Sequence, residues 1–279
     1  IDLPEPLGKS ADDTIAVAAS IFMPRGGERI ESSGRAGDLL SWEMAFLKNE
    51  AWDLDRGIAS FGIGTIETTA DTRGLHLRGE TGYIYAQDWF DLARDSDSEI
   101  GIAERVRSID MTVADLHILG QHLVNHRIRM GRGANEWFVE LEGDKILGSV
   151  NVPYDFNSGQ PIVVEAERLL LPGDDSDDDR PAAGIEPRSL PPISIKAEQL
   201  ALGNRNLGKV EAEFRRTADG LVAEGIVAQD QTFEIVGNGS WVIDEADPAG
   251  HRSFLTATLT STDVETTMRR LDYDPGITG

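Results

Sequence analysis

The chain has 279 residues, with 26 Lys and Arg against 49 Asp and Glu, and therefore a formal net charge of −23. This charge argues strongly against a nucleic-acid-binding surface or a polybasic membrane patch, because both need clustered Lys and Arg. The lack of cysteine excludes disulfides, zinc–thiolate sites and a cysteine nucleophile.

The sequence begins with Ile1 rather than Met, and we expect it to be a segment of a longer protein. It contains no run of about 20 apolar residues of the kind that spans a membrane as a helix, and no signal peptide.

Apolar and polar residues alternate with a period of two along most of the chain, which predicts β-strands with one apolar face. In chain order, the clearest segments are residues 15–21, 44–46, 58–66, 109–113, 137–142, 146–152, 162–167, 193–197, 210–214, 221–227, 233–235 and 255–259. Short connections with Gly or Asp at residues 25–28, 131–135, 142–144 and 218–220 predict hairpins and hence antiparallel neighbours. We find no βαβ rhythm.

Two short helices are predicted. The first covers residues 88–94 and follows a strand that ends near Leu77. The second covers residues 262–271, with Ser261 or Thr262 as its N-cap and arginines in its last turn. Val264, Met268 and Leu271 fall on one face of this helix. The predicted fold class is therefore mainly β: a long curved antiparallel sheet of repeating units with one or two short helices.

Residues 172–192 interrupt the alternation with a proline-flanked run of aspartates. This composition predicts a solvated linker, since the run lacks the spacing of a calcium-binding EF-hand loop. We accordingly divide the chain into a β segment with a helix near 86–94 (residues 1–171), the linker (172–192) and a second β segment ending in a helix (193–279). Residues 115–123 and 198–208 resemble each other. Each has a Leu-rich strand, a Gly turn and a Leu at the start of the next strand, ahead of a hairpin.

No motif indicates catalysis. Gly-x-Ser-x-Gly and the phosphate-binding Gly-x-x-x-x-Gly-Lys-Ser/Thr are both missing, and no spacing singles out a catalytic pair among the many carboxylates. His122 and His126 are four apart, but in a strand such residues point the same way about 13 Å apart. We therefore interpret them as ordinary polar strand positions, and we expect no metal, no cofactor and no enzyme activity.

Several short motifs follow one another in an order that is typical of one family. Residues 190–210 read LPPISIKAEQLALGNRNLGKV, and they are followed by ADGL at 218–221, GNGSW at 237–241, LTSTDV at 259–264 and LDY at 271–273. The N-terminal part contributes DLPEPLGK at residues 2–9 and GLHLRG at 74–79, with Asp88-Trp89 beyond it. Together these motifs resemble the C-terminal region of the YhdP-type branch of the AsmA-like, bridge-like lipid transfer proteins.

The resemblance implies a periplasmic protein whose parent chain is anchored in the inner membrane of a Gram-negative bacterium. Repeated β-groove units would carry phospholipid acyl chains between the inner and outer membranes on an apolar face. The implied partners are phospholipid acyl chains, neighbouring β-groove segments of the same parent chain, and outer-membrane or envelope proteins. The family supplies no catalytic motif.

The strand pattern is consistent with a groove, because two short helices cannot cover the apolar faces of about a dozen strands. We expect the groove lining to include Ile109, Met111, Val113, Ile128, Met130, Trp137, Val139, Val150, Val152, Ile195, Phe214 and Phe233. Each of these could equally belong to a plain sheet core. Two alternatives therefore stay open: a structural or interaction module of the cell envelope with a closed core and no ligand, and an enzyme such as a glycan hydrolase, which would need a close carboxylate pair in a cleft.

Overall fold

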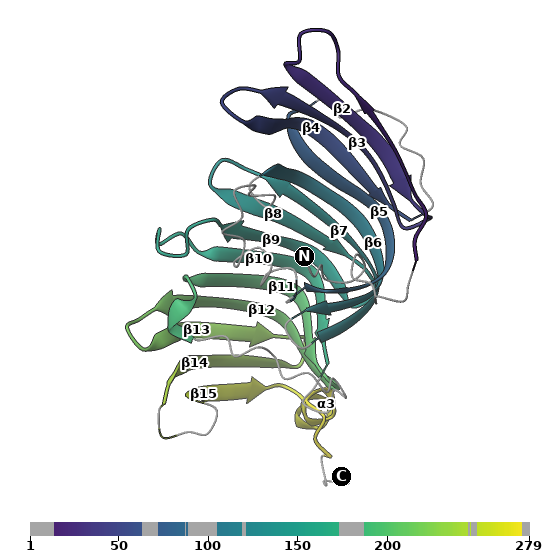
Figure 1. The fold of residues 1–279 in the computed structure, drawn as a ribbon. Coiled ribbons are helices and arrows are strands. Elements are labelled where there is room, and N and C mark those ends of the chain that lie inside the picture. Colours follow the sequence, from purple (N-terminus) through teal and green to yellow (C-terminus); the bar gives the residue numbers. More distant parts are fainter. Residues whose placement is uncertain are drawn as a thin grey trace. The chain divides into compact units, whose positions relative to one another are not determined.

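The computed structural model describes residues 14–62, 72–86, 88, 105–118, 121–172, 187–244, 246 and 250–274. Within them, 15 strands form one sheet in which the strand order follows the sequence from β1 to β15 (Figure 1). The predicted mainly β fold, with a long and mostly antiparallel sheet, is confirmed. The chain divides into two compact units, residues 1–132 and 133–279, which are described separately below.

The described residues of the first unit form seven strands, and Figure 1 shows β5 and β6 bending along their length. Their bounds are β1 Val17–Phe22, β2 Arg29–Ala36, β3 Leu40–Lys48, β4 Trp52–Phe61, β5 Gly74–Tyr85, β6 Val106–Ile118 and β7 Gln121–Arg132. The prediction that the strand before residue 88 ends near Leu77 was wrong, because β5 continues to Tyr85. Of the helix predicted over 88–94, all but residue 88 lies outside the described residues.

In the second unit, the part of the chain that the structure describes forms eight strands, a 3₁₀ turn and a helix. Their bounds are β8 Glu136–Glu142, β9 Ile146–Pro153, β10 Ile162–Leu171, η1 Pro187–Ser189, β11 Ile193–Leu202, β12 Arg205–Arg216, β13 Gly220–Gln229, β14 Phe233–Ile243, β15 His251–Ser261 and α3 Val264–Arg270.

Three strand pairs are parallel, against the expectation of antiparallel neighbours: β4 with β5, β5 with β6, and β10 with β11. Each parallel pair is joined by one of the long connections, residues 62–73, 86–105 and 172–192. A parallel partner needs a connection of about a dozen residues or more to return the chain to the same end of the sheet. Connection length, rather than the alternation itself, therefore separates the parallel pairs from the antiparallel ones.

The acidic linker predicted at residues 172–192 joins β10 to β11, and both strands lie in the second unit. They are in parallel register from Ile162 with Ile193 to Leu171 with Leu202. Residues 173–186, which carry the aspartate run, lie outside the described residues. The described end of this connection packs firmly, since Pro187 and Pro191 are among the fully buried side chains.

The two repeat segments share a topology. Residues 115–123 cover the end of β6 and the start of β7, and residues 198–208 do the same for β11 and β12. In each case the first strand pairs in parallel with the strand before it across a long connection. It then pairs antiparallel with the strand after it. The two similar sequence segments therefore occupy the same place in a repeated structural unit, in which a strand that follows a long connection forms a hairpin with the next strand.

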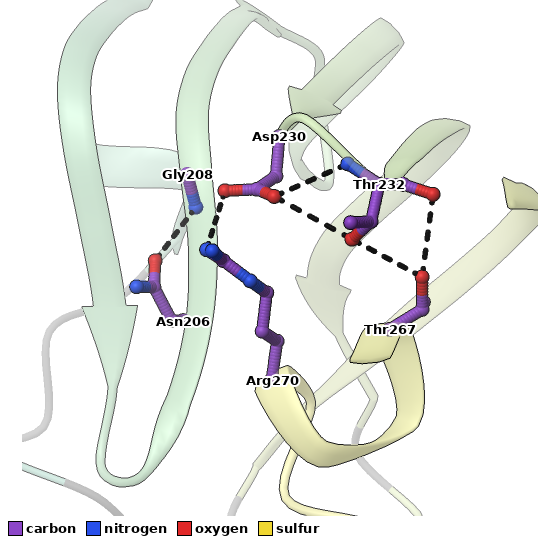
Figure 2. Close-up of polar contacts among 6 residues, drawn as sticks. All are labelled: Asn206, Gly208, Asp230, Thr232, Thr267 and Arg270. Atoms are coloured by element: carbon purple, nitrogen blue, oxygen red, sulfur yellow. Dashed lines mark hydrogen bonds and ion pairs between the residues drawn. The ribbon is translucent and has the colours of Figure 1, made fainter. Parts of the chain in front are cut away.

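Helix α3 follows β15 and contacts β12. Its N-cap is Asp263, whose carboxylate accepts from Thr266 N at 3.1 Å, so the prediction of Ser261 or Thr262 was wrong by two residues or by one. Figure 2 shows how the helix is held against the β13–β14 turn: the Arg270 guanidinium donates to Asp230 at 2.7 Å, and the Thr267 hydroxyl donates to Thr232 O at 3.3 Å.

The predicted apolar face of α3 was also partly wrong. Val264 is 57% exposed, while Thr267 and Leu271 are the buried positions. The helix turns Thr267 inward because it packs on a polar turn, where hydroxyl and carbonyl partners are available. An amphipathic pattern alone cannot identify such a docking surface.

Candidate functional site

The antiparallel and parallel registers place the side chains of the first unit in rows that run across all seven strands. One row consists of Ala19, Gly34, Trp42, Ala59, Leu77, Ile109 and Met130. The next row on the same face consists of Val17, Ala36, Leu40, Phe61, Gly79, Met111 and Ile128. No polar side chain interrupts either row, and we refer to this surface as the first apolar face.

The opposite face of the first unit is polar. On each strand, the residue between the two apolar rows points to this opposite face. These residues form a row of their own: Ala18, Arg35, Ser41, Ser60, Arg78, Asp110 and Arg129. Arg78 Nε donates to Ser60 Oγ at 3.0 Å, and Arg127 donates twice to the Asp110 carboxylate, both at 2.8 Å. The hydrogen bonds from Arg127, together with the positive charges of Arg127 and Arg129, lower the pKa of Asp110.

The second unit repeats this division. An aliphatic row crosses all eight strands and consists of Leu141, Gly148, Ala166, Ala197, Val210, Ala228, Ile235 and Leu259. A parallel row on the same face contains Val139, Val150, Val164, Ile195 and Ala212. A third contains Ile162, Ile193, Phe214, Ala223, Gly239 and Leu255. We refer to this surface as the second apolar face.

The other side of the second unit carries the acidic residues and their partners. The row adjacent to the aliphatic row consists of Glu140, Ser149, Glu165, Lys196, Glu211, Val227, Val236 and Thr258. Lys209 bridges two carboxylates on this side, Glu198 at 3.5 Å and Glu211 at 3.3 Å. The hydrogen bond that Lys209 donates to Glu211, followed by the negative charges of both carboxylates, raises the pKa of Lys209.

All twelve residues predicted to line a groove lie on the apolar face of their unit. In the first unit, Ile109 pairs with Met130 and Met111 with Ile128, while Val113 follows Met111 in the same alternation. In the second unit, Trp137 pairs with Val152 and Val139 with Val150. Ile195 and Phe214 belong to the second and third rows, and Phe233 precedes Ile235 on β14.

Burial divides the twelve into two groups. Met111, Val113 and Phe233 are buried, with 5%, 0% and 4% of their surfaces exposed. The other nine are half-buried. A closed sheet core would bury most such side chains, whereas half-buried aliphatic and aromatic groups in continuous rows leave apolar surface that a ligand can cover.

A family model described as the YhdP protein matches residues 1–279. The chain belongs to the YhdP family. No curated protein matches the sequence, and no solved structure matches it. The family match spans both apolar faces, and it confirms the resemblance that the ordered motifs predict.

In this YhdP-family chain, the first apolar face also contains residues that precede Ile109, the first residue predicted to line a groove. Trp42, Ala59 and Leu77 lie in the same row as Ile109, and Leu40 and Phe61 lie in the same row as Met111. Their strands show the same alternation, but the parallel pairings that align them with β6 could not be derived from it. If the connections 62–73 and 86–105 had been recognised as crossovers between parallel strands, the rows could have been followed from β6 back to β1.

The two histidines interpreted as equivalent polar positions have different surroundings. His126 is fully buried opposite Val113, and its Nδ1 lies 2.9 Å from Val124 O. His122 is exposed, stacks on His117 at 4.6 Å and contacts Asp115 at 2.8 Å. The interpretation was therefore wrong for His126. Asn125 lies between them in a left-handed conformation with φ 53°, which interrupts the regular strand geometry on which the interpretation relied.

Within the described part of the chain, no three or more metal-ligating side chains cluster together. The same residues include no helix with the length and hydrophobicity to cross a membrane.

Proposed function

We propose that this chain is a non-catalytic segment of a periplasmic, inner-membrane-anchored envelope protein that carries phospholipid between the inner and outer membranes. The apolar faces of its two units bind the acyl chains. The observation that carries the proposal is the aliphatic row. Each of eight strands contributes one residue to this row, and every one of them is Gly, Ala, Val, Ile or Leu.

Such a face binds hydrocarbon without selecting its length or unsaturation. Each methylene group removed from water contributes about 0.8 kcal/mol, and the aliphatic row offers no polar group that must be matched. The exchange of one acyl chain for another along the row therefore costs little. The opposite face, with Glu140, Glu165 and Glu211, keeps the sheet hydrated.

One observation favours the alternative of a structural module without ligand. Val113, Leu116, Leu123 and His126 on β6 and β7 are all less than 2% exposed, as in a dry, packed core. The second unit also has such positions, because Ala197, Leu221 and Ala223 are 1%, 2% and 0% exposed. Half-buried side chains nevertheless occur in all three of its rows, and Leu259 and Leu255 on β15 are 45% and 71% exposed.

Native mass spectrometry of the purified chain, combined with lipid extraction, tests the proposal. The wild-type chain is expected to carry phospholipid, and Val139→Asp or Val150→Asp should reduce its occupancy at least tenfold, because each places a charge on the apolar face. Phe138→Asp and Asn151→Asp are matched controls, since these residues are adjacent in sequence but lie on the opposite face.

A chain that purifies without lipid and acquires none from phospholipid vesicles would overturn the proposal in favour of the structural module. Equal loss of lipid in the control variants would also count against it. Circular dichroism of each variant separates loss of lipid from loss of fold.

A further inference from the structure

The second apolar face differs between its two ends. The aliphatic row lies toward one end of the strands. Toward the other end, a fourth row on the same face consists of Arg216, Leu221, Trp241 and Ser253. Among the four rows of this face, Arg216 is the single charged residue. On β12 it stands six residues beyond Val210, which is about 20 Å along the strand.

Arg216 is held in place by one of its terminal nitrogens. Its Nη1 donates to Phe156 O and to Asn157 Oδ1, both at 3.1 Å, in the connection between β9 and β10. Among the described residues no carboxylate forms an ion pair with this guanidinium, although the chain has 49 acidic residues. No acceptor among the described residues takes a hydrogen bond from its Nε or Nη2. A guanidinium binds a phosphate through two such parallel N–H groups.

Aromatic side chains with polar tips lie at the same end of the face. Trp241 donates from Nε1 to His251 Nδ1 at 3.1 Å. Trp137 contacts Tyr154 edge to face with ring centroids 5.9 Å apart, and the Tyr154 hydroxyl donates to Gly133 O at 2.8 Å. Such rings are suited to a boundary between hydrocarbon and polar groups, as at membrane interfaces.

We propose that Arg216 binds the phosphate group of a phospholipid whose acyl chains lie across the second apolar face. The headgroup lies at the end that carries Trp241 and Tyr154, and the tails extend toward the aliphatic row. This inference rests on the proposed lipid-binding function and adds the orientation of the lipid and its headgroup contact. The distance of about 20 Å exceeds half of the roughly 30 Å hydrocarbon core of a bilayer, which is the depth of one lipid tail.

The test compares two lipids with identical oleoyl chains, phosphatidylglycerol and diacylglycerol, in binding titrations with the whole chain. The wild type should bind phosphatidylglycerol about tenfold more tightly, since hydrogen bonds between charged groups contribute this much. Arg216→Gln should remove this difference and leave diacylglycerol binding unchanged, and Arg216→Lys should retain part of it. Arg215→Gln is the matched control, because Arg215 pairs with Glu224 on the opposite face.

The outcomes are distinguishable. If Arg216→Gln keeps the preference for phosphatidylglycerol, the headgroup contact is wrong and the acyl-chain proposal stands. If the wild type binds neither lipid, both proposals fail. Inorganic phosphate is titrated separately: competition with phosphatidylglycerol at millimolar concentration, with no competition in Arg216→Gln, supports a phosphate contact. Binding of phosphate alone, with equal affinity for the two lipids, would assign Arg216 to free phosphate and overturn the lipid orientation.

Discussion

Arg270 and Asp230 lie 40 positions apart in the sequence, and a hydrogen bond of 2.7 Å between them fixes helix α3 to the turn between β13 and β14 (Figure 2). The Asp230 side chain is 12% exposed and that of Arg270 is 35% exposed. The pair is therefore better shielded from water than the other ion pair of the helix, Arg269 with Glu265, whose side chains are 68% and 57% exposed.

We expect Arg270→Ala to lower the free energy of unfolding by about 1 kcal/mol, because it leaves a largely buried carboxylate without its partner. Arg269→Ala serves as the matched control and should cost no more than about 0.5 kcal/mol, as is typical of exposed i,i+4 pairs. Urea denaturation followed by circular dichroism measures both. Equal losses in the two variants would show that the Arg270 contact adds nothing specific.

The pH dependence of stability should contain a contribution from Asp110. Its pKa is lowered in the folded state by hydrogen bonds from Arg127 and by the charges of Arg127 and Arg129. The unfolded chain therefore takes up this proton at higher pH, near the ordinary value of about 3.9. The stabilisation is complete above that pH and is lost as the pH falls through the folded pKa.

In Asp110→Asn, this part of the acid-induced loss of stability should disappear. Arg127→Gln should reduce it by removing the main cause of the shift. Denaturation midpoints measured between pH 7 and pH 3 test both expectations. A wild-type acid profile in Asp110→Asn would rule out this carboxylate as a source of acid sensitivity.

Gly34 lies directly under the indole ring of Trp42. A Cβ at Gly34 would approach Trp42 Cζ2 to 2.4 Å and Ala18 O to 2.6 Å. Gly34→Ala should therefore destabilise the chain by about 1–3 kcal/mol through overpacking, and it should alter the tryptophan fluorescence. Gly131→Ala is the control, since no atom lies within 4 Å of the added methyl group. Similar effects at both positions would contradict this account of the Gly34 site.

Leu221 and Leu255 lie on the same apolar face with very different burial, 2% and 71% exposed. Leu221→Ala should cost about 2–4 kcal/mol, because it removes buried methyl groups and leaves a cavity. Leu255→Ala should change the free energy of unfolding by less than about 0.5 kcal/mol. Chemical denaturation checks the two values, and a large cost at Leu255 would mean that β15 is covered by a partner in solution.

Alternation predicted most strands and the face on which each apolar residue lies, because a period of two is a local property of the extended backbone. For this reason the twelve residues predicted to line a groove all lie on the apolar face of their unit. Alternation carries no information on strand direction, so the parallel partners of β5 were missed. It also fails where the backbone departs from extended geometry, as at Asn125 beside the buried His126.

Arg216 was also missed, although its signal is present in the sequence. It continues the alternation of Val210, Ala212 and Phe214, and it places a charge where the pattern calls for an apolar residue. Such a break at a strand end is usually read as the end of the strand. Only the register shows that Arg216 shares a row with Leu221 and Trp241.

Because the strand order within each unit follows the sequence, the number of strands in the sheet can change without a change in its topology. Every strand pairs with the strands before and after it in the sequence, so no distant segment has to return to complete the hydrogen bonding. Insertion or deletion of a whole hairpin would therefore lengthen or shorten the apolar rows and leave the remaining pairings intact, as in other linear repeat proteins. The same local connectivity lets pairing advance from one strand to the next, because each new strand joins the strand that precedes it in the sequence.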